Sequence, residues 1–62
     1  MTVAIINPQG GWVASSRSNS GSVATSIAPN GGYKAHCKNS DASSTFFVTC
    51  RGDIYYPHGS CA

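Results

Sequence analysis

Few residues of this chain could do chemistry: three cysteines, two histidines and two carboxylates. A Cys3His zinc set could be assembled from Cys37, Cys50, His58 and Cys61. The twelve residues between Cys37 and Cys50 do not form the close cysteine pair that marks most zinc modules. We therefore expect no metal and no other cofactor. The favoured interpretation is one disulfide plus one buried thiol, which behaves as a small apolar side chain.

Catalysis has little support in the residues present. A glycosidase needs two placed carboxylates, whereas Asp41 lies in a polar stretch and Asp53 at a turn signal. A Cys50–His58 pair lacks a third group to orient it. A chain of 62 residues also leaves little room for a pocket of ligand size. We expect a protein that is not an enzyme and has no catalytic residue.

Arg51, Gly52 and Asp53 spell the integrin-binding tripeptide. The tripeptide coincides with a predicted turn, where integrin recognition would require it. Glycine between two polar residues is also what a tight hairpin turn requires. The turn interpretation is favoured, and the adhesive one stays as an alternative.

Length, charge and cysteine content bound the function. Residues 1–62 form one small domain, which needs a disulfide or similar help to be stable. The formal net charge of +2 is too low to predict a nucleic-acid binder, and no apolar run could span a membrane. Cysteine use indicates a secreted protein whose signal peptide precedes this sequence, with Met1 as an expression start. The odd cysteine predicts a monomer that could dimerise through it.

The elements that must position these residues are expected to be strands. Glycine and serine are abundant and the good helix formers are almost missing. Turn signals separate six short strand-like segments, at 2–6, 12–16, 22–27, 33–38, 45–50 and 53–56. Pro57 is expected to end the last of them. Strands at this spacing predict an all-β fold, a small sandwich or barrel.

The core face follows from pairing segments 33–38 and 45–50 as a hairpin across the polar loop 39–44. In that hairpin Lys38 lies opposite Thr45 and Cys37 opposite Phe46. Ala35 then faces Val48, and the apolar side of the hairpin becomes the core. Trp12 is expected in the core as well, because so small a domain has few other large side chains to fill it, against the alternative of an exposed anchor.

The opposite face of this hairpin carries a basic stripe around one exposed aromatic ring. The stripe consists of Lys34, His36, Lys38, Phe47 and Arg51. Aromatic residues and arginine are enriched at interfaces. The stripe is therefore our predicted binding site, against the alternative of an ordinary solvated strand face.

The same geometry predicts which cysteines pair. Cys50 lies opposite Tyr33, four residues from Cys37 along the strand, so about 13 Å separates the two cysteines. A disulfide requires Cα atoms within about 7 Å. The chain turns at 51–52 and runs back beside segment 45–50, which brings Cys61 near loop 39–44. We predict a Cys37–Cys61 disulfide and a buried free thiol at Cys50.

The order of these segments resembles that of the ToxB-like, or MAX, effectors, which are small secreted proteins of plant-pathogenic fungi. The segments that carry the resemblance are Thr2-Val3-Ala4, Trp12-Val13-Ala14, Tyr33-Lys34-Ala35, Phe46-Phe47-Val48, the Gly52 turn and Gly59-Ser60-Cys61. The family usually joins its first strand to the loop after strand four by a disulfide, but Thr2 stands where the first cysteine would be. The resemblance implies a six-stranded β-sandwich of two three-stranded antiparallel sheets.

Two functions are carried forward. The resemblance implies a secreted, non-catalytic effector or toxin-like protein that binds a plant-host protein, by strand-edge pairing or through the basic stripe. The alternative is a small antimicrobial or carbohydrate-binding domain with stacking platforms at Trp12, Tyr33, Tyr55 and Tyr56.

Overall fold

The computed structural model describes residues 1–27, 33–49 and 55–62. These residues form six strands and one 3-10 turn: β1 (Thr2–Ile6), β2 (Trp12–Arg17), β3 (Ser22–Ile27), β4 (Tyr33–Lys38), η1 (Asn39–Asp41), β5 (Thr45–Thr49) and β6 (Tyr55–Cys61). The all-β prediction is confirmed. None of the described segments forms a helix of the length and apolarity that a membrane crossing requires.

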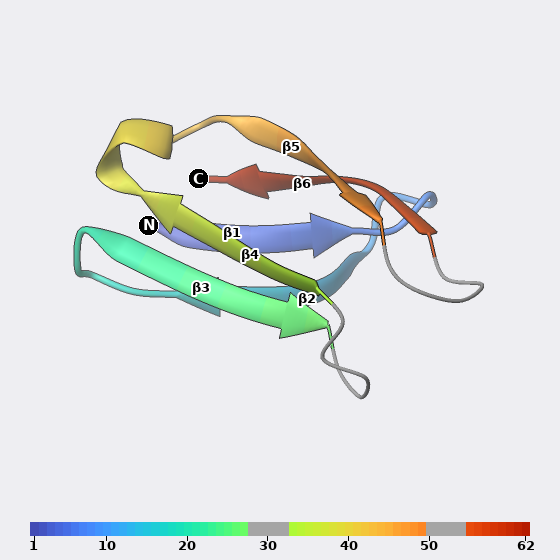
Figure 1. Cartoon of the computed structure of the whole chain (residues 1–62), viewed down its shortest axis with the longest axis horizontal. Helices are drawn as coiled ribbons and strands as arrows, with labels where there is room; N and C mark the ends of the chain where they lie inside the picture. Colours follow the sequence, from blue (N-terminus) through green and yellow to red (C-terminus); the bar gives the residue numbers. More distant parts are fainter. Residues whose placement is uncertain (28–32, 50–54) are drawn as a thin grey trace.

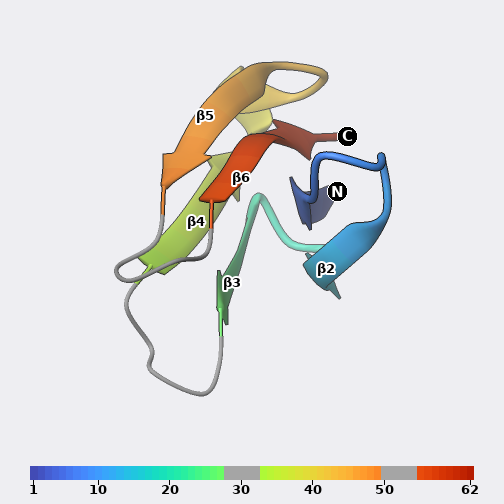
Figure 2. The same cartoon turned by 90° about the vertical axis from the view of Figure 1, so that its right-hand side faces the viewer.

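The strands form two antiparallel sheets, one of four strands in the order β2-β1-β6-β5 and one of β3 and β4 (Figure 1). Viewed from the side, the four-stranded sheet curves around the two-stranded one (Figure 2). The expected division into two three-stranded sheets is therefore wrong. The structure has six strands divided four and two.

The expected hairpin between 33–38 and 45–50 is also wrong. Lys38 lies opposite Ser22 of β3, and Thr45 lies opposite Ser60 of β6. The cause is the connection between β4 and β5. Its 3-10 turn is held by the Asp41 carboxylate, which accepts a hydrogen bond from the Lys38 backbone N–H at 3.2 Å, and Ser43 takes a positive φ of 67°. The chain thereby crosses from one sheet to the other instead of folding back on itself.

Strand β6 continues to Cys61, so Pro57 does not end it. Proline lacks a backbone donor and is tolerated in a sheet at bulges. The register between β5 and β6 shifts between Phe46, which pairs with Gly59, and Val48, which pairs with Tyr56. Pro57 falls inside this shift and lies beyond the last β1 pair, Ile6 with His58. It therefore interrupts no regular ladder bond.

The core lies between the two sheets. Its buried residues are Val3, Ile5, Val23, Ile27, Ala35, Cys37, Val48 and Cys61. The expected inward faces of β4 and β5 are confirmed, although their expected pairing is not. Side chains alternate along any strand, so the sequence pattern selects the inward face whichever strand is the partner.

A disulfide joins Cys37 of β4 to Cys61 of β6, with Cα atoms 5.7 Å apart, and it links the two sheets. The predicted cysteine pairing is confirmed. As expected, β6 runs antiparallel beside β5 and brings Cys61 to the turn after β4, where the Cys61 N–H donates to the Ser44 carbonyl at 2.8 Å. Cys50 lies outside the described residues.

Trp12 is 60% exposed, so its expected place in the core is wrong. The register between β1 and β2 shifts after Ile5, which pairs with Ala14, because Ile6 pairs with Trp12 and leaves Val13 as an extra residue. Such a bulge re-aims the side chains beside it. Ala14 packs against the core, and Trp12 projects into solvent.

Candidate binding groove

The three basic residues predicted on segment 33–38 lie on one exposed face of β4. Lys34, His36 and Lys38 are exposed, and they alternate with the buried Ala35 and Cys37. Strand alternation alone produces this arrangement. The structure therefore brings these three predicted site residues together in one row.

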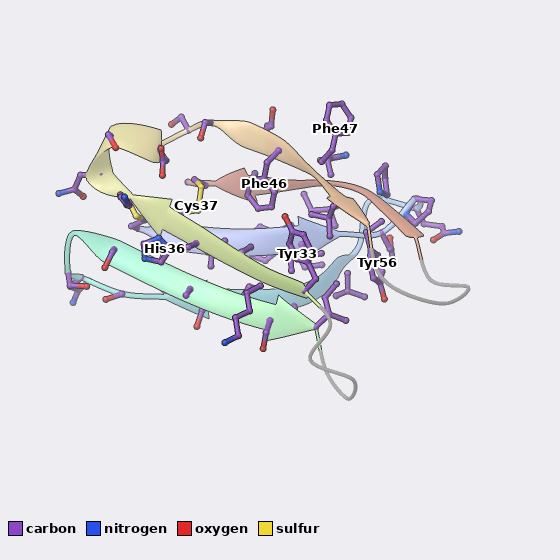
Figure 3. All side chains as sticks on the ribbon, viewed as in Figure 1. Tyr33, His36, Cys37, Phe46, Phe47 and Tyr56 are labelled. Carbon is purple, nitrogen blue, oxygen red and sulfur yellow. A yellow bond between two sulfur atoms is a disulfide. The ribbon has the colours of Figure 1, made fainter. Side chains whose placement is uncertain are left out.

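Phe47 is not part of that row. It is 83% exposed and belongs to β5 of the four-stranded sheet. Figure 3 shows its ring pointing away from β4, whereas the neighbouring Phe46 ring lies toward β4. The fifth predicted residue, Arg51, lies outside the described residues, as do Gly52 and Asp53 of the tripeptide.

A groove of about 250 Å³ opens between β4 and β5. Its lining comes from one edge of each sheet and from the turn between them: Tyr33, Lys34, Ala35, His36, Asp41, Ser44, Thr45, Phe46 and Cys61. In Figure 3 the side chains of Tyr33 and Phe46 lie in the space between the two strands. This groove occupies the place where sequence reasoning put a β-ladder.

The backbone of β4 points polar groups into this groove. The Asn39 N–H donates to the Gly21 carbonyl at 2.9 Å. Gly21 and Asn39, which lie just beyond Ser22 and Lys38 at the end of the β3–β4 ladder, therefore form a hydrogen-bonded pair. Hydrogen-bonded pairs alternate in an antiparallel ladder, so Ala35 and Cys37 bond to β3. The N–H and C=O groups of Lys34 and His36 then point the other way.

The opposite wall is arranged in the same manner. The Cys61 N–H donates to the Ser44 carbonyl, so Ser44, just before β5, and Phe46 are the residues that bond to β6. Thr45 between them turns its N–H and C=O toward the groove. Two strand edges therefore face one hollow, each with backbone donors and acceptors.

The charge beside the groove is predominantly positive. Lys34, His36 and Lys38 stand along its β4 side, and Asp41 is the acidic residue in its lining. The Asp41 carboxylate is engaged by the Lys38 backbone N–H at 3.2 Å, as part of the turn. Lys34 and Lys38 together outweigh the single negative charge of Asp41, so the net formal charge at this edge of the described chain is positive.

A second exposed feature crosses the outer face of the four-stranded sheet. Ile6 pairs with Trp12 on one side and with His58 on the other, so these three side chains form a row on one face. The bulge that exposes Trp12 has no local signature except the Gly10-Gly11 turn before it. Sequence reasoning missed this row for that reason.

The zinc site and the tyrosine stacking platforms considered from the sequence have little support among the described residues. Cys37 and Cys61 are joined to each other, so they are not available to zinc. Within the described residues no group of three or more His, Cys, Asp or Glu side chains could hold a metal ion. Tyr33 and Tyr56 are half-buried against the core.

Comparison with known proteins finds no matching family model, no similar curated protein and no similar solved structure.

Proposed function

We propose that this chain is a secreted, non-catalytic effector-type protein that binds a plant-host protein. The observation that carries the proposal is the groove between β4 and β5, where two strand edges with inward-pointing backbone groups lie beside Lys34, His36 and Lys38. Exposed strand edges are liabilities that proteins cover or use. A partner polypeptide satisfies such an edge with main-chain hydrogen bonds.

The origin and the host partner follow from the resemblance to ToxB-like effectors, which rests on segment order and length. The structure supports the proposal through an all-β chain of six strands and a disulfide that closes it. Such a cross-link suits an oxidising compartment.

The alternative is a carbohydrate-binding domain, and one observation favours it. Trp12 is 60% exposed on a sheet face, as a sugar-stacking residue would be. Against it, Tyr33 and Tyr56 are partly buried against the core, so they are less exposed than stacking platforms of this kind require.

Capture experiments with single charge reversals test the proposal. Biotinylated protein is incubated with plant-tissue extract and, separately, with chitin and cellulose. We expect a host protein to be retained, and Lys34→Glu to reduce its retention by about tenfold, because a charge at an interface rim affects association. Arg17→Glu on the exposed side of β2 makes the same change in net charge and should leave retention unchanged.

Retention on polysaccharide without any protein partner would support the alternative function. Equal losses in Lys34→Glu and Arg17→Glu would mean that net charge, not the groove, controls retention. Circular dichroism of both variants checks that each remains folded.

A further inference from the structure

We propose that the β4–β5 groove binds an extended peptide as an added strand antiparallel to β4, with acidic side chains beside Lys34 and His36 and small apolar side chains facing the groove floor. This inference rests on the proposed function and names its site and the chemistry of its partner.

The edge of β4 supplies the main-chain hydrogen bonds to the guest strand. Lys34 and His36 direct their N–H and C=O groups toward the groove, and β3 is the one ladder partner of β4 within the described chain. A guest strand opposite these residues completes two pairs of main-chain bonds. At the far end the Lys38 N–H is already bonded to Asp41, so the guest strand ends there.

The orientation follows from the ladder. Antiparallel pairing is slightly more stable per residue than parallel pairing, and β4 offers the longer free edge. Strands β4 and β5 point in opposite directions (Figure 1). A guest antiparallel to β4 is therefore parallel to β5, where the Thr45 backbone forms the opposite wall.

Acidic residues are selected on one side of the guest. Side chains directly opposite each other in a ladder share a face, and opposite charges there are stabilising. The guest residues opposite Lys34 and His36 therefore project beside two exposed basic side chains, with Lys38 next in the row. Lysine or arginine at the same guest positions would place like charges together.

Small apolar residues are selected on the other side. The intervening guest residues project toward Ala35, Phe46 and Cys61, which line the floor. Ala35 is 3% exposed and Cys61 2%. A hollow of about 250 Å³ lies below the range of about 300–1,000 Å³ that drug-sized ligands occupy. It has room for apolar side chains such as valine.

The other sheet edges lack this combination. The free side of β2 carries Arg17 as its single cation, among serines. Strand β3 carries no charged residue, and its sequence is Ser-Val-Ala-Thr-Ser-Ile. In the described part of the chain, the β4 edge alone joins a row of basic side chains to a hollow.

The test uses a synthetic peptide of alternating glutamate and valine, with blocked ends, and its lysine–valine counterpart. Both peptides carry the same valines, and they differ in the charge of the residues between them. We expect the glutamate peptide to bind at least about tenfold more tightly at low salt, with slowed amide exchange at Lys34 and His36 by NMR. The Ala35 amide, which bonds to β3, should show no such change.

A matched variant checks the charge rule. Lys34→Glu combined with Lys38→Glu should reverse the preference, so that the lysine peptide binds more tightly. A glutamate peptide methylated on the glutamate nitrogens tests the ladder. The glutamates lie opposite Lys34 and His36, so their N–H groups are the ones that bond to β4, and the methylated peptide should lose binding although its charge is unchanged.

Binding of neither peptide, or protection that maps to β2 instead of β4, would overturn the groove proposal. Failure here and failure of the proposed function are distinguishable. A host protein whose retention depends on Lys34 while no peptide protects the β4 amides refutes strand addition alone. Peptide binding at β4 with no host protein retained refutes the function alone.

Discussion

The chain crosses between its two sheets at two turns, and the two crossings differ. Residues 18–21 lead from β2 to β3, and serine side chains hold that turn: the Ser18 and Ser20 hydroxyls lie 2.7 Å apart, and the Ser20 hydroxyl donates to the Ser22 carbonyl at 2.7 Å. There β2 and β3 pack closely together. At the second crossing, 39–44, a 3-10 turn separates β4 from β5 and leaves the groove.

The covalent link lies on the open side of the molecule. The Cys37–Cys61 bond joins the last buried residue of β4 to the end of β6, next to the separating turn. Contacts between β2 and β3 hold the two sheets together at the first crossing. At the second crossing, the disulfide does so at the base of the groove. The groove can stay open because a cross-link between β4 and β6, rather than a ladder between β4 and β5, holds its two sides together.

The largest expected effect is loss of that link. Replacing both residues, Cys37→Ala with Cys61→Ala, should lower the free energy of unfolding by about 3–4 kcal/mol, because it frees a loop spanning a sequence separation of 24. Urea denaturation of the double variant measures it. A loss below about 1 kcal/mol would show that strand contacts hold the open crossing too.

The two adjacent phenylalanines of β5 test which side of that strand supports the fold. Phe46→Ala should cost about 2–3 kcal/mol, because the half-buried ring packs against the core and the groove floor. Phe47→Ala removes an exposed ring and should stay within about 0.5 kcal/mol. Thermal unfolding followed by circular dichroism compares them, and equal costs would contradict the assigned faces of β5.

The serine turn at the closed crossing should matter less. Ser20→Ala removes hydrogen bonds to Ser18 and Ser22 and should cost about 0.5–1.5 kcal/mol. Ser15→Ala on the exposed side of β2 is the control and should be neutral. Denaturation midpoints decide between them, and identical midpoints would mean that the turn is not held by its side chains.

The smallest effect concerns the turn that opens the groove. Ser43 has a φ of 67°, where a side chain is unfavourable by about 1–2 kcal/mol and glycine is not. Since glycine also loses more chain entropy on folding, Ser43→Gly should raise stability by no more than about 1 kcal/mol. Ser43→Ala should bring no gain. Destabilisation by the glycine variant would show that the Ser43 side chain supports the turn.

Local pattern decided the strands and their faces. The bounds of β1, β3 and β4 match those expected, and Ala35, Cys37 and Val48 are buried as predicted. The reason is that alternation and turn residues act within a few positions of the chain. The cysteine pairing could be predicted too, because it depended on β5 and β6 pairing with each other, and these strands are neighbours in the sequence.

Only the tertiary structure decided which strands pair across longer connections, and therefore that a groove exists. The sequence of 39–44 reads equally well as a hairpin loop, and its crossing depends on the Asp41 bond and on the backbone at Ser43. The exposure of Trp12 and the passage of β6 through Pro57 depend on bulges set by register with neighbouring strands. Register is a property of two segments at once. A one-strand pattern therefore predicts the face of a residue and leaves its neighbour across the sheet undetermined.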